Sequence, residues 1–272
     1  MPGKLLVIGG AESLDAGDDA ILERFVALAG GGDAQLVVIA TASEAPAQRE
    51  KEYTEVFQRI GAGRVLPLRL ESREDANGEL AVGTIERATG VFFTGGDQLR
   101  ITTAIGGSKV DSALHARLAE GMVLAGTSAG AAMMSSTMIL GGSIASVSSE
   151  SVRTGPGLEF LPGVLIDMHF AERGRLNRLL SAIAMFPHEL GLGIDENTAI
   201  LVDTEADGVV FEVLGSGAVT VIDAGPAKRI TCPAADNPIA LWGVQLHVLP
   251  AGHRFNLTER MPMKRSEEDH AD

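Results

Sequence analysis

Short apolar runs alternate with amphipathic stretches through the first half of the chain. Each run is long enough for one buried strand, and each stretch between two runs repeats its apolar positions at helical spacing. This order is typical of an α/β fold with a doubly wound, mostly parallel sheet flanked by helices. The predicted strands are residues 4–10, 35–41, 64–70, 91–96 and 122–126, and the predicted helices are residues 18–29, 46–60, 98–105 and 110–120.

The second half of the chain becomes richer in β structure. An apolar strand is predicted at 163–170, a basic helix at 172–186 and another apolar stretch at 191–203. Residues 141–157, rich in serine and glycine, are expected to form a long loop near the functional site. Extra C-terminal β strands are predicted at residues 208–215, 218–223 and 240–249.

The composition is that of a globular protein. Of the 272 residues, 45% are hydrophobic and 21% are charged, and 33 glycines fit many tight strand-to-helix turns. No linker, repeat or low-complexity tract interrupts the chain. We therefore expect a single α/β domain over residues 1–259 and a flexible, charged tail over residues 260–272.

Membrane and secretory settings are not expected. The N-terminal "MPGKLLVIGGAE" has the pattern of a first strand rather than of a signal peptide, and no run of about 18 uncharged apolar residues is present. The single cysteine, Cys232, leaves no intrachain disulfide and no cysteine zinc cluster. We expect a cytoplasmic protein that does not bind membranes.

The net charge of −14 argues against nucleic acid as a partner. Phosphate backbones are bound by clustered lysine and arginine, which an acidic protein of this kind does not favour. An acidic surface is compatible with a cationic, arginine-rich ligand, and equally with simple solubility.

The sequence "GTSAGAAMM" places Ser128 directly after the apolar run 122–126. A strand that turns abruptly into a helix needs small residues around the turn, and a serine at its tip is held outward as a nucleophile elbow. The same pattern also fits a turn that merely lets a helix pack close to a sheet. The serine therefore needs a base elsewhere in the chain.

A serine hydroxyl becomes a strong nucleophile only when a base takes its proton. Among six histidines, His169 follows the apolar strand predicted at 163–170, and we expect it at the sheet edge where Ser128 emerges. The other five have ordinary structural or solvent-exposed interpretations: His115, His188, His247, His253 and His270.

The acid that would orient the histidine has three candidates. Glu196, in "GIDEN", follows a short apolar strand and so can reach the same edge. Glu150, in the predicted loop, is an alternative. Asp195 is either an acid or a turn residue. We prefer Glu196.

An acyl-transfer site also needs donors for an oxyanion. The backbone N–H of Ala129, directly after Ser128, is one candidate. The other comes from the Gly95–Gly96 turn, with Gly96 as the expected donor, because two adjacent glycines let the backbone approach a substrate closely.

Further polar residues lie close to these positions in the sequence. Asp97 and Gln98 begin a predicted helix and could cap it or bind a ligand. Arg173, Arg175 and Arg178 follow His169, and we expect Arg175 and Arg178 to share one face of the helix. Although such arginines usually face solvent, their guanidinium groups could bind carboxylates.

Four sequence blocks follow one another in the chain: "FFTGGDQLRI", "GTSAGAAMMSSTMI", "GVLIDMHFAERGRLNRLL" and "GLGIDENTAI". Together they resemble the cyanophycinase family of serine peptidases, which is related to the aspartyl dipeptidases. The resemblance runs from about residue 4 to 203 and implies a class I glutamine-amidotransferase-like (flavodoxin-like) sheet. It also implies a substrate, cyanophycin, a poly-aspartate chain with arginine on each β-carboxylate, cleaved to β-Asp-Arg dipeptides.

The resemblance also implies residue roles. Ser128 matches the family's nucleophile, His169 its general base, and Glu196 lies in the block where the acid is expected. Met168 stands where family members often have glutamine, which leaves room for a different aspartyl peptide as substrate. The residues expected to bind substrate are Asp97, Gln98, Asp167, Arg173, Arg175 and Arg178.

The expected partner is cyanophycin or a β-aspartyl peptide, and the resemblance implies a homodimer. No H-E-x-x-H, Walker or G-x-G-x-x-G pattern is present, so we expect neither a metal nor a cofactor. Two other functions stay open: an aspartyl or isoaspartyl dipeptidase acting on short peptides, and a non-catalytic binding protein with the same fold.

Overall fold

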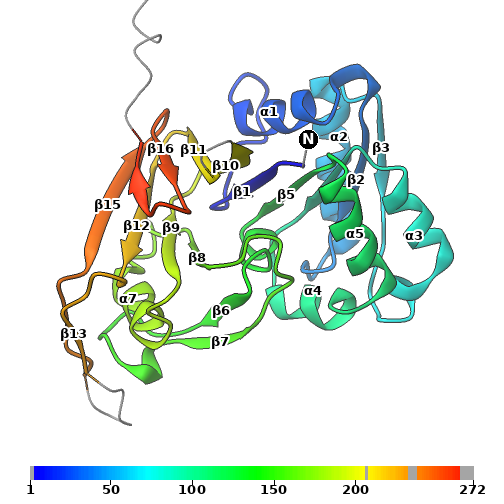
Figure 1. Cartoon of the computed structure of the whole chain (residues 1–272). Coiled ribbons are helices and arrows are strands. Elements are labelled where there is room, and N and C mark those ends of the chain that lie inside the picture. The colour runs from blue at the N-terminus through cyan, green and yellow to red at the C-terminus, as the bar shows by residue number, and fades with distance from the viewer. Residues whose placement is uncertain (1–2, 206–207, 232–237, 264–272) are drawn as a thin grey trace, which may run out of the picture.

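The computed structural model describes residues 3–205, 208–231 and 238–263 and contains two main β-sheets (Figure 1). The larger has a parallel centre, β1-β5-β4-β2-β3, which antiparallel strands extend beyond β1. In spatial order its strands are β17 (Met261–Pro262), β16 (Arg254–Asn256), β11 (Gly208–Gly215), β10 (Thr198–Glu205), β1 (Leu5–Ile8), β5 (Val123–Thr127), β4 (Gly90–Phe93), β2 (Gln35–Ile39) and β3 (Arg64–Pro67).

The second sheet has four strands, and only its β8–β9 pair is parallel. Its strands are, in order, β15 (Gln245–Pro250), β12 (Ala218–Asp223), β9 (Leu190–Ile194) and β8 (Val164–Met168). Two short antiparallel ribbons complete the described strands: β6 (Thr137–Gly141) with β7 (Arg153–Pro156), and β13 (Arg229–Ile230) with β14 (Leu241–Trp242).

Helices cover both faces of the parallel strands and the outer face of the second sheet (Figure 1). The α-helices are α1 (Ala20–Leu28), α2 (Pro46–Ile60), α3 (Glu79–Glu86), α4 (Gln98–Ile105), α5 (Lys109–Ala119), α6 (Ala129–Ala132) and α7 (Leu176–Met185). The short 3₁₀ helices are η1 (Gly31–Asp33), η2 (Asp75–Asn77) and η3 (Ser149–Ser151).

Side chains alternate between two cores along each central strand. In β1, Leu6 and Ile8 pack with α1 and α2, whereas Leu5 and Val7 face the opposite side. Because helices or another sheet cover both faces, the central strands are apolar at nearly every position, with polar residues only at their ends. This double burial explains why the central strands are recognisable as continuous apolar runs.

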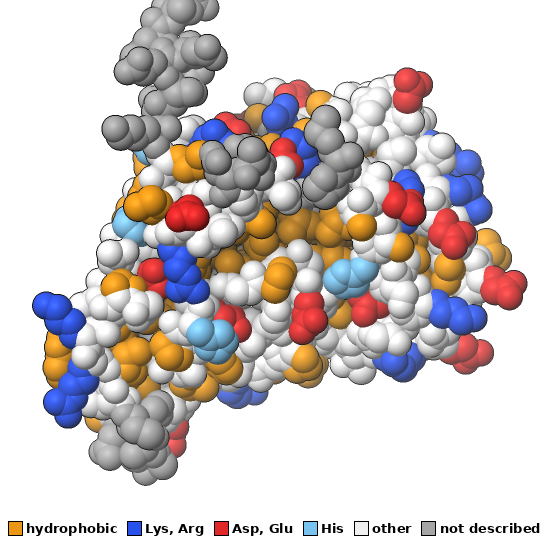
Figure 2. Space-filling view, viewed as in Figure 1, with side chains coloured by type: hydrophobic (Ala, Val, Ile, Leu, Met, Phe, Trp, Pro, Cys, Tyr) orange, Lys and Arg blue, Asp and Glu red, His pale blue; other side chains and the backbone are white. Residues whose placement is uncertain are grey.

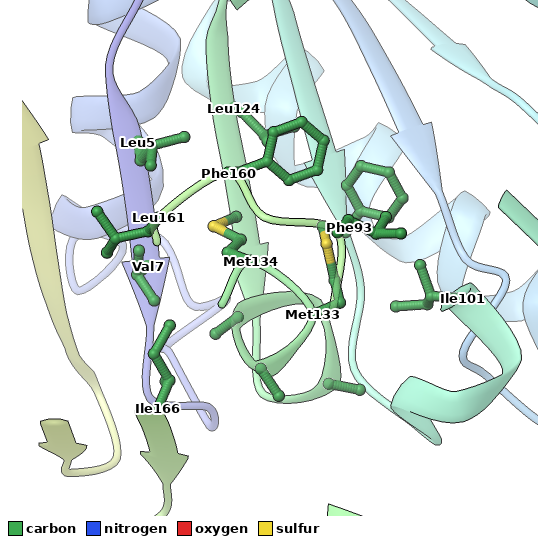
Figure 3. Close-up of a cluster of buried hydrophobic side chains, with 14 of the residues drawn as sticks. Leu5, Val7, Phe93, Ile101, Leu124, Met133, Met134, Phe160, Leu161 and Ile166 are labelled. Atoms are coloured by element: carbon green, nitrogen blue, oxygen red, sulfur yellow. The ribbon is translucent and has the colours of Figure 1, made fainter. Parts of the chain in front are cut away.

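The core between the two sheets also holds the segment that follows Ser128. Met133 and Met134, at the end of α6, are fully buried with Phe93 from β4 and Ile166 from β8 (Figure 3). Strands of both sheets therefore contribute to one continuous hydrophobic cluster. Its packing ties the turn at Ser128 to the second sheet.

The prediction of an α/β fold with a central, mostly parallel sheet is confirmed. Two of its helices, 46–60 and 98–105, have the predicted bounds at both ends. Helix α3 was not predicted, since its eight residues, "ELAVGTIE", include a helix-weakening glycine.

Other predictions need correction. The expected loop at 141–157 contains β7, which pairs with β6. The basic helix begins at Leu176 rather than at residue 172, because Gly174 adopts a left-handed conformation (φ +58°). The apolar stretch 191–203 is divided between β9 and β10, which belong to different sheets.

The predicted tail begins too early. Met261 and Pro262 pair with β16, and the guanidinium of Arg260 donates a 2.7 Å hydrogen bond to Asp223. These contacts tie residues 260–262 to the folded structure. Residues 264–272 of the predicted tail lie outside the described residues, as does Cys232.

Candidate active site

Ser128 lies at a sharp turn between β5 and α6. Its backbone has a positive φ (φ +52°, ψ −108°), a conformation that a residue other than glycine adopts at an energetic cost. The turn depends on close backbone approaches at both flanks. A Cβ on Gly126 would lie 2.2 Å from the carbonyl oxygen of Gly130, and a Cβ on Gly130 would lie 2.4 Å from that of Phe93.

His169 follows β8, and its imidazole contacts the serine. The Nε2 atom lies 3.0 Å from Ser128 Oγ. The backbone N–H of His169 donates a 2.8 Å hydrogen bond to the carbonyl of Gly9, after β1. A Cβ on Gly10 would lie 2.3 Å from the imidazole Cε1, so this glycine provides the surface on which the ring lies.

Glu196 completes a chain of three side chains. Its Oε1 lies 2.6 Å from His169 Nδ1. Asp195 is a turn residue here, since its two carboxylate oxygens accept hydrogen bonds from the backbone N–H groups of Ala171 and Ala218. Glu150 lies exposed in η3. The carboxylate that is hydrogen-bonded to His169 Nδ1 is that of Glu196.

The electrostatic surroundings favour the neutral form of the imidazole. Burial lowers the pKa of His169 below its ordinary value, the hydrogen bond to Glu196 opposes this shift, and the positive charges of Arg173 and Arg175 reinforce it. With Nδ1–H donated to Glu196, Nε2 is left to accept the proton of Ser128. The three groups can thus act as nucleophile, base and orienting acid.

The expected oxyanion donors lie beside the serine. Gly95 and Gly96 line the same cavity as Ser128, and a Cβ on Gly95 would come within 3.9 Å of Ser128 Oγ. Gly96 is left-handed (φ +143°), and a Cβ there would lie 2.0 Å from the carbonyl oxygen of Ala42. Ala129 begins α6, where backbone N–H groups have no intrahelical acceptor.

Asp167 and Arg178 bind each other in the interior. Asp167 has no exposed surface, and its Oδ2 accepts a 2.9 Å hydrogen bond from Arg178 Nε, while a second Arg178 nitrogen contacts Oδ1. Arg175, the residue directly before α7, donates to the Met168 carbonyl and, at 3.4 Å, to Asp167 Oδ1, so Arg175 and Arg178 contact the same carboxylate. Burial and the charge of Arg178 lower the pKa of Arg175 to about 10.

The other predicted binding residues also have partners or stand exposed. Asp97 caps α4 by accepting a 2.9 Å hydrogen bond from Leu99 N–H, and Gln98 donates one of 2.6 Å to the Ile139 carbonyl. Arg173 is exposed near His169. Asp97 lines a neighbouring cavity of about 440 Å³ rather than that of Ser128.

Sequence reasoning missed most of the cavity around Ser128. This cavity has a volume of about 530 Å³ and contains charged residues from the segments after β1 and β2. Two signals could have found them: the acid in "GGAE" after the first strand, and the only tyrosine of the chain. The missed polar residues are Glu12, Ser43, Glu44, Arg49, Tyr53 and Thr127.

A second, apolar hollow contains no candidate nucleophile. Hydrophobic side chains gather in a hollow on the face shown in Figure 2. A cavity of about 390 Å³ on the β1 and α5 side is lined mainly by apolar residues, among them Leu5, Phe160 and Val202, with His115. The candidate nucleophile Ser128 and its base His169 both line the other cavity, of about 530 Å³.

Within the described residues, no cluster of three histidine, cysteine or acidic side chains could hold a metal ion. A search of the same residues finds no helix with the length and apolar character needed to cross a membrane.

Comparisons with known proteins agree on one family. The model of peptidase family S51 matches residues 5–208. A protein named cyanophycinase from a Nostoc species is 38% identical over 260 residues, 94% of this chain and 86% of that protein. Another of the same name from Geminocystis herdmanii is 38% identical over 264 residues, 95% of each.

Solved structures share the fold at lower sequence identity. A peptidase from an acI-B1 Actinobacterium superposes with a TM-score of 0.70 at 21% identity, covering 94% of this chain and 97% of that one. A putative peptidase E protein from Listeria monocytogenes has a TM-score of 0.52 at 15% identity, covering 79% of this chain and all of that one.

Proposed function

The chain belongs to peptidase family S51, and from that premise we propose that this serine peptidase hydrolyses cyanophycin to β-Asp-Arg dipeptides. The observation that carries the chemistry is the continuous contact from Ser128 Oγ through the His169 imidazole to Glu196. The substrate is supported by relatives named cyanophycinase that are 38–39% identical over most of the chain.

The reaction proceeds through an acyl-enzyme. Ser128 Oγ attacks the scissile carbonyl carbon while His169 Nε2 takes its proton, and backbone N–H groups of Gly96 and Ala129 bind the oxyanion. The tetrahedral intermediate collapses, and His169 gives the proton to the departing amine. A water then attacks the ester carbonyl with His169 as base, which releases the second product and restores Ser128. Glu196 stabilises the imidazolium at both stages.

The first test is product release from cyanophycin, read by mass spectrometry. The wild type should release β-Asp-Arg, and Ser128→Ala should lose about 10⁴-fold or more in rate while keeping the same melting temperature. Release by Ser128→Ala near the wild-type rate would refute the assigned nucleophile. Cleavage of short β-aspartyl peptides without any attack on the polymer would instead assign a dipeptidase.

We also propose that the protein acts as a homodimer in the cytoplasm. The edge strand β15 supports association, because its Leu246 and Val248 side chains are 51% and 59% exposed. Light scattering of the purified protein tests the dimer, and a monomeric mass would contradict it. Fractionation of the producing cells tests the compartment.

A further inference from the structure

The cavity of Ser128 contains a carboxylate that the proposed reaction does not use. Glu12 follows β1 and is buried, with 7% of its surface exposed. Its Oε1 accepts a hydrogen bond from the hydroxyl of Tyr53 and its Oε2 one from that of Thr127. Since Thr127 directly precedes Ser128, these contacts fix the carboxylate at a set position relative to the nucleophile.

The backbone before Glu12 is held in a costly conformation. Ala11 is left-handed (φ +49°), directly after the left-handed Gly10, and Ala11 itself lines the cavity. The segment is anchored by the Asn197 N–H, which donates to the Gly10 carbonyl at 2.9 Å, and by the Ser13 N–H, which donates to Asn197 Oδ1 at 3.2 Å. Strain of this kind persists where the surrounding structure holds a side chain in a particular direction.

The partners of Glu12 provide no counter-ion for an ionised carboxylate. Within the described residues Glu12 forms no ion pair, and its donors are two neutral hydroxyls and its own backbone N–H. An ionised carboxylate can accept about four hydrogen bonds, so an acceptor direction remains. Burial raises the pKa of Glu12, which marks the cost of ionising it in the absence of a cation. A ligand cation would remove that cost.

Arg49 supplies the opposite charge in the same cavity. It lies on α2, and its side chain is about half exposed, with Nη1 2.8 Å from Glu52 Oε2. Its charge is close enough to Glu12 to oppose the rise in that pKa. A guanidinium has five N–H donors, so the pair with Glu52 leaves several for a ligand.

Building on the hydrolysis of cyanophycin proposed above, we propose that Glu12 and Arg49 form the subsite for the arginine moiety of the substrate. In cyanophycin the α-amino group of each arginine is tied up in the amide, which leaves one cation and one anion. Glu12 accepts hydrogen bonds from the guanidinium, and Arg49 donates to the free α-carboxylate. The subsite thus selects arginine by both charged ends.

The test uses oligomers of β-Asp-Arg and two matched analogues. In one, citrulline replaces arginine, so that a neutral urea stands for the guanidinium; in the other, the arginine carboxylate is an amide. For Glu12→Gln, the arginine-to-citrulline ratio of kcat/KM should fall about 10- to 100-fold, through KM. For Arg49→Gln, the carboxylate-to-amide ratio should fall about 10-fold or more.

Controls separate binding from folding and from the proposed function. A fluorophosphonate that labels Ser128 reports an intact nucleophile in each variant. Tyr53→Phe removes a hydrogen-bond donor to Glu12 but keeps the carboxylate. It should therefore lower kcat/KM equally for the arginine and the citrulline oligomers. Arg49 is on a surface helix, so Arg49→Gln should fold even if Glu12→Gln does not. If the wild type releases β-Asp-Arg but both variants keep the wild-type ratios of kcat/KM, the subsite is overturned and the proposed function stands. Absence of release by the wild type would overturn the proposed function and the subsite with it.

Discussion

Ser128 and His169 are held by two sheets that differ in how completely they are covered. The sheet of Ser128 has a parallel centre with helices on one face and helices and the second sheet on the other, and β1, β4 and β5 are buried throughout. The sheet of His169 and Glu196 is mixed, and its edge strand β15 exposes apolar side chains. Strands β8 and β9, which lead to His169 and Glu196, are nevertheless buried throughout, so the exposed edge of the second sheet lies two strands away from β9.

The difference places a structural demand on the junction between the sheets. The backbone N–H of His169 donates to Gly9, and that of Gly9 donates to Thr198, so the loop after β1 is hydrogen-bonded to segments on both sides. Glu196 lies in the three-residue connection between β9 and β10, which passes from one sheet to the other. Contact between Ser128 and His169 thus depends on how the sheets dock.

The largest expected effect tests the acid from the second sheet. Glu196→Gln keeps the size of the side chain but removes the charge that stabilises the imidazolium, so kcat should fall about 10³- to 10⁴-fold with little change in melting temperature. Glu150→Gln, on exposed η3, is the matched control and should stay near the wild-type rate. A large loss with Glu150→Gln instead would move the acid to the loop.

The next effect tests whether the second sheet depends on its buried ion pair. Arg178→Met leaves the buried carboxylate of Asp167 without its closest cation, so the free energy of unfolding should fall by about 3 kcal/mol. Lys51→Met removes an exposed pair with Glu55 and should cost less than about 0.5 kcal/mol. Denaturant titration measures both, and equal costs would contradict the contrast between interior and surface.

A third variant tests the junction itself. Gly10→Ala would place a Cβ 2.3 Å from the His169 ring, so the ring must move and the rate should fall about 100-fold. Gly17→Ala is the control, because Gly17 is also left-handed (φ +87°) but has nothing within 4 Å of the added Cβ. Both variants should lose about 1 kcal/mol of stability through backbone strain. Equal activity in the two would show that the ring does not depend on Gly10.

The smallest effect concerns the pH profile. The charge of Arg173 lowers the pKa of His169, and the base must be neutral to accept a proton. Arg173→Gln should therefore raise that pKa, so that kcat/KM starts to fall at a higher pH as the solution is acidified. In the acidic range where kcat/KM falls, the variant should have a kcat/KM about two- to threefold below that of the wild type. The two values should converge at higher pH. A limb that stays in place or moves to lower pH would contradict the electrostatic effect of Arg173.

Local patterns in the sequence were sufficient for most of the parallel half of the molecule, with helix α3 as the exception. Buried central strands are continuous apolar runs, and α2 and α4 begin and end where predicted. The sharp turn at Ser128 could also be expected, since its close backbone approaches at Gly126 and Gly130 need glycine whatever the rest of the chain does.

The sequence by itself thus determined the fold class, the order of strands and helices in the first half apart from α3, and the elements that hold Ser128, His169 and Glu196. Only the tertiary structure decided that β8 and β9 form a separate sheet, that Asp167 pairs with Arg178 in the interior, and that Glu12 and Arg49 share the cavity of Ser128. The physical reason is that periodicity reports which side of an element is buried, whereas its neighbours are chosen by contacts between residues far apart in the chain.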